Sequence, residues 1–116
     1  MKNANDKFGS SNGSENFFVH KPSLFLYTDG VKDMAETCGA YWLIDLIISY
    51  QCTRDINLER FQVWDLKRVK DNAFGIVATD GNDNKIASQE IPFSDFPFDF
   101  ATLWLVDGCI MLPKEY

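Results

Sequence analysis

The chain has 116 residues, a mass of 13.3 kDa and a formal net charge of −6, and this length fits one domain rather than two. Nearly half of the residues are hydrophobic, which excludes wholesale disorder, yet no apolar run approaches the ~20 residues that a membrane-spanning helix needs. Residues 1–70 hold as many basic as acidic side chains, so residues 71–116 carry the whole negative excess. This distribution disfavours direct binding of nucleic acid, because phosphates repel carboxylates, and it favours a protein partner with a basic surface.

The first fifteen residues are rich in Asn, Ser and Gly, and we expect residues 1–15 to form a disordered tail. Residues 16–116 then form a single domain. The tail lacks the apolar stretch of a secretion signal, so we expect a cytoplasmic protein. The three cysteines are odd in number and widely spaced, which argues against a disulfide framework. No metal site and no cofactor are expected.

Two helices are expected in the first half of the domain. Thr28 can cap the first helix, whose apolar face follows the spacing i, i+3, i+4 and i+7: Val31, Met34, Ala35 and Cys38. Residues 40–50 are apolar nearly all round, which predicts a second helix at the centre of the domain, wrapped by the rest of the chain.

The second half reads as strands and turns. Strand-forming residues and turn signals alternate, and they predict strands over 61–69, 74–79, 85–91, 103–106 and 109–112. Because these strands follow one another across short turns, their pairing is expected to be antiparallel. The sequence therefore predicts an α+β fold, with two N-terminal helices packed on a four- to five-stranded antiparallel sheet.

No pattern of residues indicates a reaction, and a non-enzymatic protein is expected. His20 is the only histidine, and nothing in its flanks identifies a catalytic triad. An enzyme or ligand-sensing domain would need a pocket near His20, Tyr41 or Asp45. A buried Asp45 with a shifted pKa would favour that alternative, whereas an exposed or paired Asp45 would be structural.

The most unusual segment is residues 90–100, in which phenylalanines alternate with acids and prolines. Two interpretations are open: the phenylalanines fill the core, or they anchor a docking surface whose carboxylates pair with Arg and Lys of a partner. The residues assigned to partner binding are Asp80, Asp83, Asp95, Phe96, Phe98 and Asp99. Reversing the charges of Asp95 and Asp99 is expected to abolish binding without lowering the melting temperature.

Several motifs resemble an uncharacterised family of small bacterial, plasmid and phage proteins. They are residues 26–32 (LYTDGVK), 39–45 (GAYWLID), 49–51 (SYQ), 61–64 (FQVW), 95–97 (DFP) and 112–116 (LPKEY). The resemblance covers roughly residues 24–116. It implies no established activity, and it suggests an origin in mobile elements, whose small acidic proteins include inhibitors of the anti-CRISPR type.

Together these features lead to one preferred hypothesis. The chain is expected to be a protein-binding module from a mobile element, an inhibitor of the anti-CRISPR type, that docks on the basic nucleic-acid-binding site of a host effector nuclease. Its partner would then be a CRISPR effector ribonucleoprotein, with no direct contact to nucleic acid or to a membrane. A small enzyme or ligand-sensing domain and a homodimeric structural module remain as alternatives.

Overall fold

The computed structural model describes residues 2–8, 16–21 and 23–116. One seven-stranded sheet runs through it in the order β1-β2-β7-β6-β3-β4-β5. The strands are β1 (Phe17–Val19), β2 (Leu26–Thr28), β3 (Phe61–Lys70), β4 (Ala73–Thr79), β5 (Lys85–Ile91), β6 (Phe100–Val106) and β7 (Cys109–Met111). The helices are α1 (Asp29–Cys38), α2 (Tyr41–Tyr50) and α3 (Arg54–Asn57), with 3₁₀ turns η1 (Ala4–Asp6) and η2 (Pro113–Glu115).

The strands predicted from the second half of the sequence are confirmed as an antiparallel block. β3 pairs with β4 and β6, β4 pairs with β5, and β6 pairs with β7, all antiparallel. The hairpin between β6 and β7 turns on Asp107 and Gly108, which both have positive φ, as a two-residue turn that matches the twist of the strands requires.

The sheet is larger than four or five strands, and it is not wholly antiparallel. β1 and β2 extend it at one edge, and β2 lies parallel to β7. β2 precedes the three helices and β7 is the last strand along the chain, so these two neighbours are separated by most of the sequence. A three-residue apolar run carries no pattern that distinguishes a strand from a helical turn, and its parallel partner lies too far along the chain for any turn signal to reveal it.

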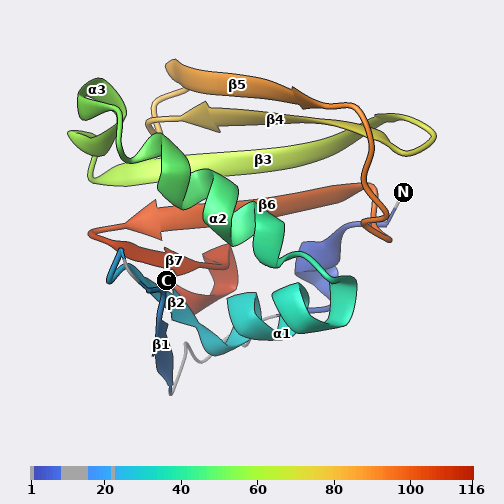
Figure 1. The fold of residues 1–116 in the computed structure, drawn as a ribbon, viewed down its shortest axis with the longest axis horizontal. Coiled ribbons are helices and arrows are strands. Elements are labelled where there is room, and N and C mark those ends of the chain that lie inside the picture. The colour runs from blue at the N-terminus through green and yellow to red at the C-terminus, as the bar shows by residue number, and fades with distance from the viewer. Residues whose placement is uncertain (1, 9–15, 22) are drawn as a thin grey trace.

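The helices cover one face of the sheet (Figure 1). α1 begins at Thr28, whose side chain accepts a hydrogen bond from the Val31 amide, and all four residues of its predicted apolar face are buried. α2 lies across the sheet and buries Leu43, Ile44, Ile47 and Ile48. The expectation that the chain wraps α2 was wrong, because Tyr41 and Asp45 on its far side are exposed. In the part of the chain that the structure describes, no helix is long and apolar enough to cross a membrane.

The N-terminal segment corrects the expected domain boundary. Residues 9–15 lie outside the described residues, but residues 2–8 pack on the domain. β7 pairs only with the last part of β6, so the rest of that strand edge is open to another partner. The Asn5 side chain pairs with this part of the β6 edge: it donates to the Thr102 carbonyl (2.8 Å) and accepts from the Thr102 amide (2.6 Å). Ala4 and Phe8 are buried in the core, so this segment is part of the folded unit.

Candidate functional site

The two phenylalanines assigned to partner binding point into the protein. Phe96 is 1% exposed and meets the Phe74 ring edge-on, with centroids 6.0 Å apart. Phe98 is half-buried and meets the Phe8 ring at the same separation. Phe96 cannot reach a partner without leaving the core, so the structure corrects its assignment as a surface anchor. The exposed aromatic residue of this segment is Phe93.

Arg68 explains why the segment folds inward. Its Nη2 donates to the carbonyls of Phe96 (2.9 Å) and Phe98 (3.3 Å), and Nη1 donates to the carbonyl of Asp71. Its Nε donates to Asp99 Oδ1 at 2.9 Å. An arginine whose fork of donors meets several fixed acceptors holds a loop in one conformation. The carboxylate of Asp99 therefore has a structural partner, while Asp95 stays exposed.

We expect Asp99→Asn to lower the urea midpoint of unfolding at neutral pH, and the deficit to shrink in acid. Hydrogen bonding from the Lys2 amide, and then from Arg68, holds the pKa of Asp99 below its usual 3.8. A depressed folded pKa stabilises the protein above the unfolded pKa, and that stability is lost as the pH falls through the folded pKa. Unfolding curves of wild type and Asp99→Asn at about pH 6 and about pH 3 check this.

An equal loss of stability at both pH values would contradict the role given to the Asp99 carboxylate.

The same contacts revise the expected effect of reversing the charge of Asp99. Replacing Asp99 by lysine places a cation against Arg68 and removes the acceptor of the Lys2 amide. We therefore expect the reversal of Asp99 to lower the melting temperature, whereas reversal of the exposed Asp95 leaves it unchanged.

The other two assigned carboxylates lie far from Asp95 and Asp99. Asp80 and Asp83 belong to the turn between β4 and β5, and Asp95 follows the opposite end of β5. Strands of seven residues span about 23 Å. Asp80 accepts hydrogen bonds from the Asn82 amide (2.9 Å) and from Asn84, which lower the pKa of Asp80. The six assigned residues therefore do not form one surface.

Two of the residues that the alternative hypothesis names, His20 and Asp45, contact each other. His20 Nε2 lies 2.8 Å from Asp45 Oδ1, and Nδ1 lies 2.7 Å from Ser23 Oγ. The Tyr41 hydroxyl instead donates to Glu36. The Asp45 side chain is 66% exposed and paired, which by the criterion set above makes it structural.

The two amides that follow Ser23 offer no oxyanion hole for a Ser-His-Asp reaction. The amides that follow Ser23 are both occupied: Leu24 donates to the His20 carbonyl, and Phe25 donates to Ser23 Oγ. An oxyanion hole needs free donors beside the nucleophile. We interpret this cluster as a clasp between the β1–β2 loop and α2. Among the described residues no group of His, Cys, Asp and Glu is placed to hold a metal ion.

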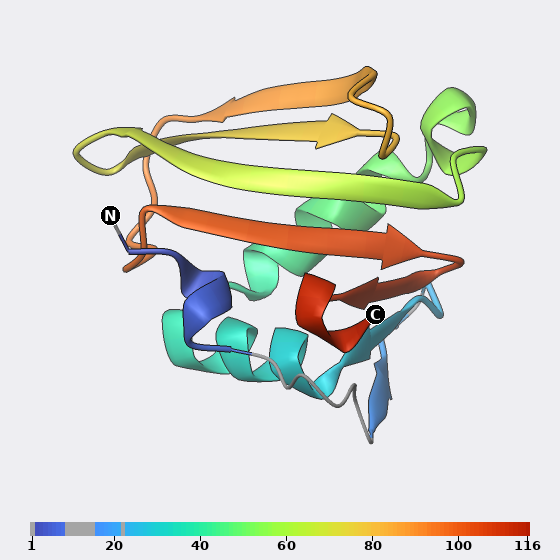
Figure 2. The ribbon, with the colours of Figure 1, turned by 180° about the vertical axis from the view of Figure 1, so that it is seen from behind.

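The second face of the sheet gathers features that the sequence analysis missed. Figure 2 shows the molecule from behind, with this face toward the viewer. Within the described chain no helix crosses β3, β4 or β5 on this side. Three aromatic side chains come together on it: Phe61 and Trp104 have centroids 5.0 Å apart, and Tyr116 lies 5.5 Å from Trp104. We call Phe61, Trp104 and Tyr116 the aromatic cluster.

The neighbours of the cluster on the same face are also apolar. Val63 pairs with Trp104 across the β3–β6 ladder, and Val106 pairs with Phe61. A sheet with one buried face is expected to show polar residues on the other. The signal that could have revealed this face is therefore the apolar residues at both sets of alternating positions in residues 61–69 and 100–106.

The turn that carries two of the assigned carboxylates borders the aromatic cluster. A side-chain carbon placed on Gly81 would lie 2.8 Å from Phe61 Cδ1, so the turn that carries Asp80 and Asp83 packs directly against that ring. Tyr116 is 73% exposed at the other side of the cluster. The structure thus joins an acidic turn to an aromatic cluster whose exposed member is Tyr116.

These features define a small α+β domain with a partly aromatic sheet face. The chain belongs to DUF6876, a family of unknown function, whose model matches residues 2–116. No curated protein and no solved structure matches the chain. The predicted resemblance to a family of uncharacterised proteins is therefore confirmed.

Proposed function

We propose that this protein is a non-enzymatic binding module that docks on a basic protein surface through the aromatic cluster and the adjacent acidic turn. The observation that carries the proposal is the aromatic cluster, in which Phe61 and Trp104 are half-buried and Tyr116 is exposed, on a face where no α-helix of the described chain crosses β3, β4 or β5. Exposed apolar patches with a polar border are typical of protein interaction sites. Aromatic side chains at the centre of such sites supply most of the binding energy.

Charge supports a basic partner. The turn that carries Asp80 and Asp83 packs against the cluster at Gly81, on a chain whose net charge is −6. Carboxylates at the rim of an interface speed the encounter with a basic surface and select against acidic ones. A nucleic acid is disfavoured on the same ground, since its phosphates would approach these carboxylates.

The finer form of the proposal names the kind of partner. We propose a nuclease that holds nucleic acid in a basic channel, as CRISPR effectors do. A small acidic module that occupies such a channel would inhibit the nuclease. A mobile element that encodes the module would benefit from this inhibition. This form extends the docking proposal and can fail while the docking proposal stands.

The test compares two exposed aromatic residues at opposite ends of the sheet. Tyr116 and Phe93 are 73% and 71% exposed, so serine at either position removes a similar exposed ring. Tagged wild type is incubated with nuclease-treated lysate of a host that encodes CRISPR effectors, and captured protein is quantified against salt. We expect Tyr116→Ser to weaken capture about tenfold or more, and Phe93→Ser to leave it unchanged.

A second pair of variants tests the charge. Asp83→Asn keeps a residue that tolerates the positive φ of 66°, and Asp95→Asn makes the same change at the far end. We expect only Asp83→Asn to weaken capture and to reduce its sensitivity to salt. Loss of capture in Phe93→Ser and Asp95→Asn instead would place the docking surface on residues 90–100 and overturn the proposed face. Self-association through Tyr116, measured by sedimentation, would replace the foreign partner by a second copy.

A further inference from the structure

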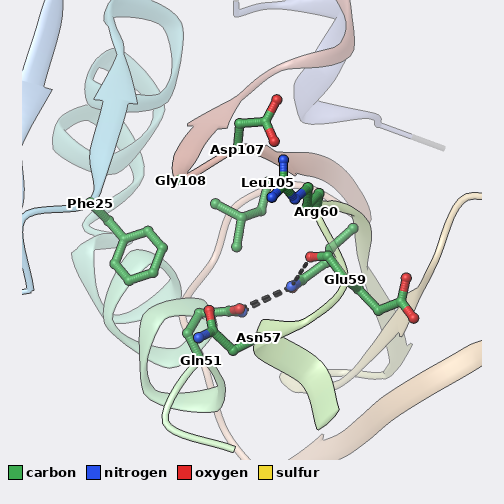
Figure 3. Close-up of a pocket in the computed structure, with 9 residues that line it drawn as sticks. Phe25, Gln51, Asn57, Glu59, Arg60, Leu105, Asp107 and Gly108 are labelled. Atoms are coloured by element: carbon green, nitrogen blue, oxygen red, sulfur yellow. Dashed lines mark hydrogen bonds between the residues drawn. The ribbon is translucent and has the colours of Figure 1, made fainter. Parts of the chain in front are cut away.

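A cavity of about 260 Å³ opens where α2, α3 and the β6–β7 hairpin meet. It lies at the helix-bearing side of the sheet, because Gln62 and Leu105 on its wall alternate with the residues of the aromatic cluster along their strands. Figure 3 shows the Phe25 ring beside Leu105, and these two side chains form the apolar part of a lining that is otherwise largely polar. Its volume is slightly below the ~300 Å³ at which pockets for drug-sized molecules begin, so it suits a smaller ligand.

The wall of the cavity is held in place by two buried amides. Gln51 and Gln62 donate to each other's side-chain oxygens at 2.9 Å in both directions. Gln62 Nε2 also lies 2.9 Å from the carbonyls of Ile56 and Glu59. These bonds fix the loop from α3 to β3, which carries polar residues at the rim. A rim fixed by buried hydrogen bonds is pre-organised for binding.

The rim carries two solvent-exposed side chains of opposite charge, Arg60 and Asp107, that form no ion pair with each other. The Asp107 amide donates to the Arg60 carbonyl at 3.0 Å, so the two backbones adjoin. Both side chains line the cavity, and Figure 3 shows them across it from Phe25. Within the described residues, no ion pair joins Arg60 or Asp107 to any side chain. Glu59 turns its carboxylate away from Phe25 in the same view.

We propose that this cavity binds a free amino acid with an aliphatic side chain. A guanidinium is matched to a carboxylate by paired hydrogen bonds, so Arg60 would take the α-carboxylate. Asp107 would take the ammonium group, and the aliphatic side chain would lie between Phe25 and Leu105. A zwitterion leaves neither charge at the rim unpaired, whereas a simple anion would face Asp107 and a simple cation would face Arg60. This site does not depend on the proposed docking face.

The first test titrates L-leucine into the ¹⁵N-labelled protein and follows amide chemical shifts. We expect saturable shifts at Asn57, Arg60 and Gly108, which line the cavity. Leucinamide lacks the carboxylate and N-acetyl-L-leucine lacks the ammonium group. Each analogue is expected to bind at least about tenfold more weakly, because one charge-assisted hydrogen bond is lost.

Two variants assign each end of the ligand. Arg60→Gln is expected to bind leucine and leucinamide equally, and Asp107→Asn is expected to bind leucine and N-acetyl-L-leucine equally. Asparagine tolerates the positive φ of 48° at position 107, so the turn is preserved. Asp71→Asn in the β3–β4 turn, where φ is also positive (51°), removes the same charge outside the cavity and should keep the wild-type preference.

Three results would overturn the site. They are the absence of saturable shifts up to tens of millimolar leucine, shifts that map away from the cavity, and wild-type affinities that do not distinguish leucine from its blocked analogues. None of them bears on the docking face, whose test uses capture by Tyr116 and Phe93 variants.

Discussion

Gly30→Ala is expected to lower the free energy of unfolding by roughly 2–4 kcal/mol. The methyl group would lie 2.8 Å from Glu115 Oε1 and 2.9 Å from Leu112 Cδ1. Glu115 is buried and cannot yield cheaply, because it accepts hydrogen bonds from the Thr28 hydroxyl (2.6 Å), the Gly30 amide (3.1 Å) and the Leu112 amide (3.0 Å). Alanine gains up to about 1 kcal/mol of helix propensity over glycine, which is too little to offset the loss of this arrangement.

The control is Gly75→Ala, the same chemical change in β4. A methyl group on Gly75 meets only Val69 Cγ2, at 3.8 Å, which is ordinary van der Waals contact. Urea unfolding of both variants should therefore show a large loss for Gly30→Ala and a change within about 0.5 kcal/mol for Gly75→Ala. Similar stabilities of the two variants would show that Glu115 can move aside without loss.

The Gly30 contact also clarifies two motifs that suggested the family. The segment LYTDGVK and the final LPKEY are separated by most of the chain, yet Glu115 joins them around the first turn of α1. A carboxylate at a helix N-terminus satisfies amides that the helix leaves open. These motifs are thus explained as a structural clasp between the C-terminus and α1, and no reaction is needed to account for them.

Local signals in the sequence predicted the local parts of the fold. The cap at Thr28, the apolar face of α1 and the turn at Asp107 each depend on residues within a few positions of one another, and all three are confirmed. The parallel pairing of β2 with β7 and the docking of Asn5 on Thr102 depend on residues almost a chain length apart. No spacing pattern records such contacts.

The candidate site shows the same limit. The alternation of phenylalanine and aspartate in residues 90–100 suits either a docking loop or a core-filling loop, and the decision rests with Arg68, some thirty positions away. Its bonds turn Phe96 inward. The aromatic cluster is likewise assembled from β3, β6 and the C-terminus. Only the register of the strands brings Phe61, Trp104 and Tyr116 together.

Gln62→Leu is expected to cost roughly 3–5 kcal/mol of stability, because the buried amide serves several partners at once. Gln62 is 1% exposed. Its side-chain oxygen accepts hydrogen bonds from Trp64 Nε1 (3.0 Å) and from Gln51. Its side-chain nitrogen donates to Gln51 and to the carbonyls of Ile56 and Glu59. Leucine has a similar size, so the loss comes from stranded donors and acceptors rather than from a cavity.

The matched control is Gln89→Leu, since Gln89 is exposed and accepts one hydrogen bond, from the Tyr50 hydroxyl (2.7 Å). Water replaces that bond, and we expect a cost below about 1 kcal/mol in the same urea titration. Leucine at both Gln51 and Gln62 should recover only part of the loss, because the Trp64 N–H and two carbonyls still lack their partner. If the double variant regained wild-type stability, the Gln51–Gln62 bonds alone would account for the cost, and the loop that carries Arg60 would not depend on Gln62.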